Sequence, residues 1–194
     1  MIEPIFTDAV VCRAPFLHVK IPSIIPEQSA DSALRWLATA APWKLRVEHF
    51  YEQEEFSLLT AKPAGEMGFL VASSFIEPLR HEIRNRFRLQ NLPAVVDVNA
   101  HRLTPGQTIR VHNDFLDGEE THRVLIQLND GWAVEQGGLL MLFDGPTPEE
   151  VHSIIVPKHR SGFVFEITHR SFHAVSQIKH GERYTLVYTF RAAD

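Results

Sequence analysis

The second half of the sequence constrains the fold most, because it consists of short strand-like runs separated by turn residues. About eight runs rich in Val, Ile, Phe, Thr and Tyr are bounded by Pro, Gly and Asn-Asp pairs. They are Val95–Thr104, Thr108–His112, Arg123–Leu128, Leu139–Phe143, Ser153–Val156, Phe163–Ile167, Ala174–Ile178 and Tyr184–Phe190. Such spacing is typical of a double sheet of the jelly-roll or cupin-like kind and unlike an α/β fold. It predicts a mainly β fold whose core spans residues 95–191.

Residues 1–94 have a mixed pattern, which predicts helices and strands that support this core. Ser29–Ala41 carries apolar side chains at helical spacing. Ser74-Phe-Ile-Glu77 has the pattern of a capping box and is expected to begin a second helix. Val10–Ile21 and Leu45–Tyr51 are strand-like. We expect the helices to pack on one sheet, within a single domain of 194 residues.

Alternation along the last run divides its side chains between two faces. One face is apolar and is expected to lie under the N-terminal helices; it carries Tyr184, Leu186, Tyr188 and Phe190. The other face is expected to line the inside of the barrel; it carries Arg183, Thr185, Val187 and Thr189. A charged arginine would therefore lie inside the β core.

Charge and cysteine content narrow the class of protein. The net charge of −5 disfavours a general nucleic-acid binder, because phosphate binding needs a basic surface. The single cysteine, Cys12, excludes an intrachain disulfide and fits a reducing compartment. There is no signal-peptide pattern and no apolar run of membrane-spanning length. We expect a cytoplasmic protein without a membrane or nucleic-acid partner, and the oligomeric state stays open.

The chemistry-bearing motif is His112-Asn113-Asp114, followed 59 residues after Asp114 by His173. Side chains at i and i+2 project from the same face of a strand end. Two histidines and one carboxylate form the facial triad that binds non-haem Fe(II) and leaves three coordination positions open. Alone, the His-x-Asp pattern is a weak signal, since the chain has 11 histidines.

Arg183 strengthens this interpretation, because it follows His173 by ten residues and points into the same barrel. A permanently charged, fork-shaped donor in such a place needs a carboxylate partner. Glu166 is one candidate within the chain, and the distal carboxylate of a bound 2-oxo diacid is another. Thr185 lies on the same face and could add a hydroxyl donor.

These motifs resemble those of the prolyl-4-hydroxylase-like branch of the 2-oxoglutarate/Fe(II) dioxygenases, over about residues 97–191. The matching stretches are Arg102-Leu-Thr-Pro-Gly-Gln107 before the His-x-Asp, Gln127-Leu-Asn-x-x-Trp132, Gly137-Gly-Leu-Leu140, and His173-x-Val-x-x-Ile-x-x-Gly-x-Arg183. The resemblance implies that His112, Asp114 and His173 bind Fe(II) and that Arg183 binds the distal carboxylate of 2-oxoglutarate. It also implies O2 as co-substrate, succinate and CO2 as products, and hydroxylation of an amino-acid side chain, free or within a peptide.

Two positions depart from the family pattern. Leu103 and Gln127 stand where the family often has tyrosines near the co-substrate. The Gln127 amide can still donate a hydrogen bond, and we count it among the candidate co-substrate contacts. Leu103 cannot donate one, so part of the usual set of co-substrate partners is missing.

Three further features are candidates for binding the substrate. Arg110 lies two residues before His112 and is expected to share its face; it would bind an anionic group or pair with a nearby acid. Trp132 would either form a wall of the substrate cavity or pack in the core. Phe115–Thr121 combines apolar residues, Gly118 and three acids, and would act as a lid or as a solvated loop. An acidic lid and an internal arginine together would suit a zwitterionic amino acid or a short peptide.

Other functions fit parts of this pattern. A cupin-like module could hold a metal or a small ligand without turnover, and a dioxygenase could act on a small molecule that is not an amino acid. Asp114 disfavours an all-histidine cupin dioxygenase. Conversion of 2-oxoglutarate to succinate by iron-loaded protein separates an enzyme from a binding module.

Overall fold

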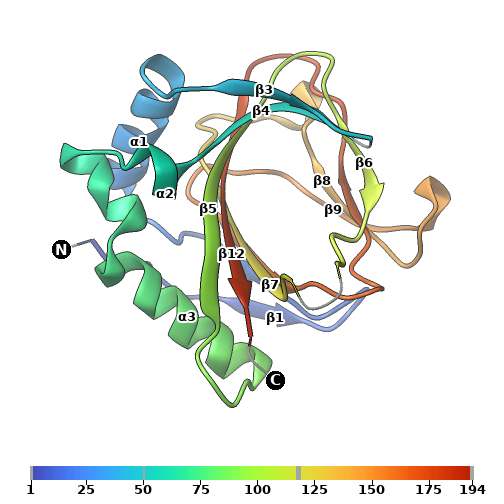
Figure 1. Cartoon of the computed structure of the whole chain (residues 1–194). Helices are drawn as coiled ribbons and strands as arrows, with labels where there is room; N and C mark the ends of the chain where they lie inside the picture. The colour runs from blue at the N-terminus through green and yellow to red at the C-terminus, as the bar shows by residue number, and fades with distance from the viewer. Residues whose placement is uncertain (1, 50, 117–118, 193–194) are drawn as a thin grey trace.

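Two β-sheets form the core of the computed structural model, which describes residues 2–49, 51–116 and 119–192 (Figure 1). The eight-stranded sheet has the order β1 (Val10–Cys12), β2 (His18–Ile21), β10 (Gly162–Glu166), β7 (His122–Gln127), β12 (Arg183–Arg191), β5 (Ala94–Leu103), β4 (Glu52–Ser57) and β3 (Lys44–Val47). The four-stranded sheet has the order β6 (Ile109–His112), β11 (His173–Val175), β8 (Leu140–Phe143) and β9 (Val151–Ile155). Strands β5 to β12 correspond one by one to the predicted runs, so the mainly β, double-sheet prediction is confirmed.

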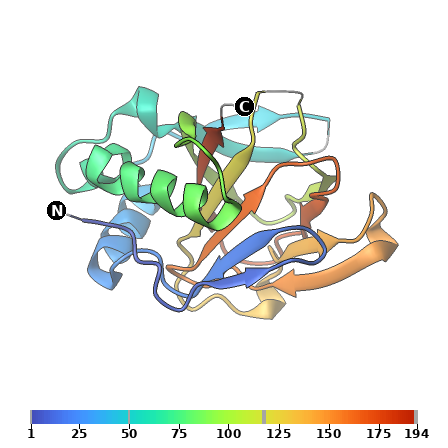
Figure 2. The ribbon, with the colours of Figure 1, turned by 90° about the horizontal axis from the view of Figure 1, so that it is seen from below.

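The helices come from the first half of the chain and cover one face of the larger sheet (Figures 1 and 2). They are α1 (Glu27–Thr39), α2 (Leu58–Ala61), α3 (Ser73–Phe87) and the 3-10 turn η1 (Gly65–Val71). Two more 3-10 turns, η2 (Val134–Gln136) and η3 (Pro148–Glu150), lie in loops of the core. Among the described helices, none is long and apolar enough to cross a membrane.

The predicted apolar face of β12 packs against these helices. Tyr184, Leu186, Tyr188 and Phe190 belong to one buried cluster with helix residues such as Leu37 of α1 and Leu79 of α3. The Tyr188 hydroxyl donates a hydrogen bond to the carbonyl of Leu70, at 2.9 Å, and so satisfies the one polar group of a fully buried ring. The opposite face of β12 is left to line the space between the two sheets.

Several local predictions for the N-terminal part were wrong. Helix α3 begins at Ser73 without a side-chain cap, and the Glu77 carboxylate accepts hydrogen bonds from Arg80 instead of closing a capping box. The expected strand Val10–Ile21 is a hairpin of β1 and β2, interrupted near Pro15, which has no N–H to donate to a ladder. Strand β4 was not predicted, because its sequence Glu52-Gln-Glu-Glu55 lacks apolar alternation.

A buried histidine under the helices should make stability depend on pH. His122 is 1% exposed, its ring packs on Phe87, and its Nε2 has no hydrogen-bond partner among the described residues. Burial lowers the pKa of His122 from 6.5 to about 4. As the pH falls below 6.5, His122 is therefore protonated in the unfolded chain before it is protonated in the folded protein. The stability that depends on a neutral His122 is lost between pH 6.5 and 4.

We expect the free energy of unfolding of His122→Leu to depend less on pH than that of the wild type. By the usual equivalence of about 1.4 kcal/mol per pKa unit, the wild type should lose about 2–3 kcal/mol more than the variant between neutral pH and about pH 4.5. Urea unfolding of both proteins at the two pH values measures the difference. His180→Gln, at an exposed position, is the control and should behave as the wild type. Equal losses in the wild type and His122→Leu would contradict the assignment.

Candidate metal and co-substrate site

A cavity of about 590 Å³ lies between the inner faces of the two sheets. The larger sheet contributes inward-facing residues of β4, β5, β7 and β12, and the smaller sheet contributes residues of β6, β8 and β11. Strand β12 presents the four residues predicted from its alternation, Arg183, Thr185, Val187 and Thr189. The inward orientation of this face is thereby confirmed.

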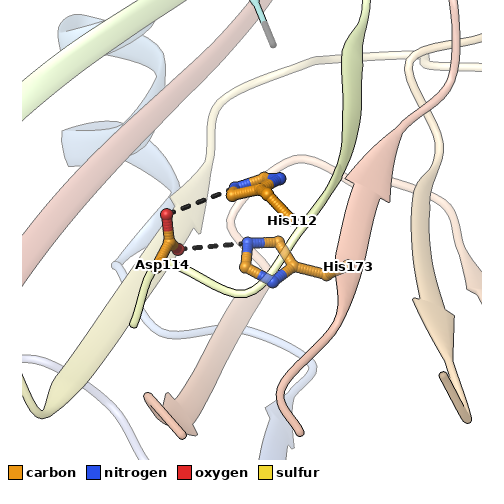
Figure 3. Close-up of side chains that lie close together, drawn as sticks. All are labelled: His112, Asp114 and His173. Atoms are coloured by element: carbon orange, nitrogen blue, oxygen red, sulfur yellow. Dashed lines mark ion pairs between the residues drawn. The ribbon is translucent and has the colours of Figure 1, made fainter. Parts of the chain in front are cut away.

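His112, Asp114 and His173 meet at one side of this cavity (Figure 3). Strands β6 and β11 are neighbours, and His112 and His173 are direct partners in their register. The Nε2 atom of each histidine lies 3.2 Å from an oxygen of Asp114, and the three ligand atoms are all within 4.8 Å of one another. The sequence motif therefore brings together a donor set that could hold one metal ion.

Hydrogen bonds orient both imidazole rings. Nδ1 of His112 lies 2.8 Å from the carbonyl oxygen of Arg110, and Nδ1 of His173 lies 2.8 Å from that of Ser171. A carbonyl oxygen only accepts, so in the neutral ring the proton is on Nδ1 and the lone pair is on Nε2. Carbonyl partners of this kind fix the tautomer of metal-binding histidines and leave Nε2 directed at the site.

The carboxylate is held at the end of β6 by a local turn. Asp114 has a φ of 59°, in the left-handed region that aspartate tolerates better than most residues. The Asn113 side chain supports the turn: it accepts a hydrogen bond from the backbone N–H of Phe115 at 3.1 Å and donates one to the His169 carbonyl at 3.3 Å. This geometry turns Asp114 back toward the two histidines.

The protonation states suit a metal. Burial would raise the pKa of Asp114, but Arg123 and His173 hold it well below its usual range. Burial lowers the pKa of His173, and nearby His112 lowers it further. The site thus offers an ionised carboxylate and a neutral imidazole, which are the forms that coordinate metal ions.

Arg123 is a residue of the site that the sequence analysis missed. It lies on β7, lines the cavity, and donates from Nη1 to Asp114 Oδ2 at 2.6 Å and from Nη2 to Glu120 Oε2 at 2.7 Å. Burial alone would lower the pKa of Arg123, yet the pKa is raised, because these two carboxylates favour the charged form. Alternation in phase with Leu125 and Gln127 was the signal that could have placed it inside.

Arg183 is buried without a counter-ion. It is 4% exposed, its Nε has no hydrogen-bond partner, and no described acid lies within ion-pair distance. Burial lowers its pKa to about 10. Glu166, the alternative partner, is paired in register with His122 on the helix-covered side of the sheet. A buried guanidinium that faces a cavity without an acid is suited to bind an anionic ligand.

The other candidates for co-substrate binding lie beside Arg183. Thr185 is its neighbour on the inner face of β12, and the Thr185 hydroxyl donates to Gln127 Oε1 at 3.0 Å. Gln127 is 3% exposed, pairs with Thr185 in register, and is not among the residues that line the cavity. His101 of β5 lies opposite Thr185 in register and does line the cavity, although the sequence had assigned it no role. Leu103 packs in an apolar cluster with Val175 and Ile178.

The prediction that the Arg110 side chain shares the inward face of His112 was wrong. Between Ile109 and His112, strand β6 has one residue more than the facing stretch of β11, which is a β-bulge. The extra residue breaks the two-residue alternation, so Ile109 and His112 line the cavity while the Arg110 side chain is exposed.

Trp132 follows the packing alternative, and the segment after the triad contributes to the cavity wall. Trp132 packs beside Leu103 and donates from Nε1 to the Gly137 carbonyl at 2.9 Å, and it does not line the cavity. Phe115, Leu116 and Glu120 do line the cavity, but the Glu120 carboxylate is engaged by Arg123. Residues 117–118, which include Gly118, lie outside the described residues.

The sequence of the chain is similar to a family model and to a known protein. Residues 98–191 match the model of the 2OG-Fe(II) oxygenase superfamily. "Prolyl 3-hydroxylase OGFOD1" of Xenopus laevis is 30% identical over 115 residues, which cover 54% of this chain and 22% of that protein. The chain therefore spans about a fifth of the length of this relative.

Solved prolyl hydroxylases share the fold. A Pseudomonas putida prolyl-4-hydroxylase has a TM-score of 0.70 at 21% identity, covering 91% of this chain and 93% of that one. A Trichoplax adhaerens prolyl hydroxylase, in complex with a hypoxia-inducible-factor peptide, has a TM-score of 0.68 at 14% identity, covering 90% and 83%. A viral collagen prolyl hydroxylase of Paramecium bursaria Chlorella virus 1 has a TM-score of 0.64 at 17% identity, covering 91% and 96%. Residues 98–191 thus resemble the 2OG-Fe(II) oxygenase superfamily in sequence, and the chain shares its fold with solved prolyl hydroxylases.

Proposed function

We propose that the chain is a 2-oxoglutarate- and Fe(II)-dependent dioxygenase that hydroxylates an amino-acid side chain within a peptide or protein. One observation supports this above all: a triad of two imidazoles and a carboxylate shares its cavity with a buried arginine that has no acid partner among the described residues. A metal-binding module would need the triad alone. The arginine adds a place for an anion beside the metal.

The residues fit Fe(II) and 2-oxoglutarate. His112, Asp114 and His173 would hold the metal through three ligands and leave its other positions for the co-substrates. Arg183 would bind the distal carboxylate of 2-oxoglutarate. Thr185 lies beside it on the same wall and would donate to the ligand only if its hydroxyl turned away from Gln127 Oε1. When bound, these groups supply the oxidising chemistry, in which O2 and 2-oxoglutarate give a hydroxylated product, succinate and CO2.

Four apolar side chains form part of the cavity wall. Leu125, Leu140, Val175 and Val187 line the cavity and give it a partly apolar interior. Low polarity strengthens the charge-assisted contacts of Arg183 and Asp114. The chain's own contribution is thus to hold the metal through three ligands and to anchor an anion.

The substrate class is inferred from related proteins and from the cavity rim. The Trichoplax neighbour was solved with a peptide, and the Xenopus relative is named a prolyl hydroxylase. The zwitterion hypothesis loses its basis, since Arg110 is exposed away from the cavity and Glu120 is paired with Arg123. Rim residues from separate segments, including Arg46, Tyr51 and the 60% exposed Leu116, give a mixed surface that suits a peptide chain.

A substrate screen tests the proposal. Iron-loaded protein is given 2-oxoglutarate with a peptide library, with free amino acids, or with a set of terpenoids, lipids and nucleobases. Succinate formation and a mass gain of one oxygen atom are measured. We expect stimulation by peptides above a slow substrate-free rate, and none in the His173→Ala variant. Stimulation only by a terpenoid, lipid or nucleobase would show that the amino-acid class is wrong. Complete absence of succinate under all conditions would favour a non-catalytic module.

A further inference from the structure

Arg123 makes a contact with the triad that sets it apart from the other arginines and lysines of the described chain. It is the one that forms an ion pair with Asp114, from Nη1 to Oδ2 at 2.6 Å. Its second nitrogen, Nη2, is bound to Glu120 Oε2 at 2.7 Å, so the guanidinium is anchored at both ends. Only 22% of the Arg123 side chain is exposed, and the Asp114 side chain is 7% exposed.

A bound metal ion would affect the contacts of Asp114 with the two histidines and with Arg123 differently. Oδ1 lies 3.2 Å from His112 Nε2, and Oδ2 lies 3.2 Å from His173 Nε2. Both Nδ1 atoms face carbonyl oxygens, so each ring would bind a metal ion through Nε2. With a metal on Nε2, neither histidine could donate a hydrogen bond to the carboxylate. Arg123 would then be the charged donor that still holds Asp114.

We propose that Arg123 is a positioning residue for the metal ligand Asp114, an inference that rests on the proposed function. By engaging Oδ2, Arg123 leaves Oδ1 as the ligand atom and keeps the carboxylate from binding the metal through both oxygens. A second bound oxygen would take one of the positions that the co-substrates need. Removing a residue that hydrogen-bonds to a metal ligand commonly lowers the metal affinity by about 10–100-fold.

Glu120 completes this arrangement by fixing Arg123. The planar guanidinium can donate to two carboxylates at once, whereas a lysine ammonium is a point charge on a flexible chain. Asp114 and Glu120 lie on either side of Arg123, and the pair of contacts defines its orientation in the cavity wall. The role therefore depends on the shape of the arginine as well as on its charge.

Metal binding without turnover tests the proposal. Arg123→Gln, Arg123→Lys and the wild type are titrated anaerobically with Co(II), in the absence of 2-oxoglutarate, and the visible absorption of the bound ion is recorded. We expect Arg123→Gln to bind Co(II) about 10–100-fold more weakly, with an altered absorption spectrum, and Arg123→Lys to lie between it and the wild type.

Arg46→Gln is the matched control. Arg46 also donates to two glutamates, Glu48 at 2.9 Å and Glu55 at 2.8 Å, and lines the same cavity, but it forms no ion pair with the triad residues. Its Co(II) affinity and spectrum should equal those of the wild type. Wild-type affinity and spectrum in folded Arg123→Gln would overturn the proposal, as would an equal loss in Arg46→Gln.

A crystal structure of the Co(II)-loaded wild type tests the proposal without the use of a variant. One Asp114 oxygen on the metal and the other on Arg123 would support the proposal. An Asp114 bound through both oxygens, or an Arg123 turned away from it, would overturn it. The proposed function is tested separately by removing a histidine ligand, so a failure of the one can be told from a failure of the other.

Discussion

Replacing His112 or His173 with alanine should abolish stoichiometric iron binding. Each histidine supplies one of three ligand atoms that lie within 4.8 Å of one another, and each is already oriented by a carbonyl partner at 2.8 Å. Because changes outside the ligand set already cost about 10–100-fold in affinity, loss of a ligand should cost more than about 100-fold. The measurement is anaerobic titration with Fe(II), repeated with Co(II), since such a site also accepts other divalent ions.

His180→Ala is the control for these variants. His180 is exposed and lies outside the cavity lining, so its loss should leave metal content unchanged. Normal iron content together with normal turnover in His112→Ala or His173→Ala would refute the ligand assignment. The same result would refute the proposed dioxygenase function, independently of any result for Arg123.

Arg183→Gln should keep the metal and lose most of the affinity for 2-oxoglutarate. Arg183 is 4% exposed and has no acid partner among the described residues, so a bound carboxylate would be its counter-ion. Losing a buried, charge-assisted pair typically costs about 2–5 kcal/mol, which corresponds to a fall in affinity of roughly 30-fold or more. Calorimetric titration of the Co(II)-loaded protein, without oxygen, measures this affinity directly.

A second ligand makes this experiment specific. 2-Oxobutyrate keeps the 2-oxo acid group but lacks the distal carboxylate, so Arg183→Gln should bind it about as well as the wild type does. Thr185→Val, which removes only a neutral hydroxyl from the same wall, should show a smaller loss for 2-oxoglutarate than Arg183→Gln. If Arg183→Gln binds 2-oxoglutarate as the wild type does, or weakens both ligands equally, Arg183 is not the distal anchor.

The parts of this protein that the sequence alone determined depend on short-range regularities. The two-residue period of a strand predicted that Arg183 and Thr185 face inward and that Tyr184 and Leu186 face the helices, and the structure confirms both. The eight core strands were found because turn residues separate runs of β-branched and aromatic residues. The ligand motif could be recognised because its residue types and spacing are characteristic of one kind of metal chemistry.

Tertiary structure decided the features in which a contact between distant segments outweighs the local pattern. The β-bulge of β6, visible only against β11, turned Arg110 outward although it lies two residues from His112. Strand β4 forms despite its charged sequence because it pairs with β5, where Arg102 donates to Glu54 at 2.6 Å.

The partnership of Arg123 with Asp114 shows the same limit within the site itself. Arg123 follows Asp114 by nine positions, and no motif links them, since their contact depends on β7 lying across the cavity from the end of β6. Spacing along the sequence could therefore predict which three residues come together as a candidate metal site. Only the folded arrangement of the two sheets decided which side chain holds the carboxylate in place, because that contact exists only once β6 and β7 face each other across the cavity.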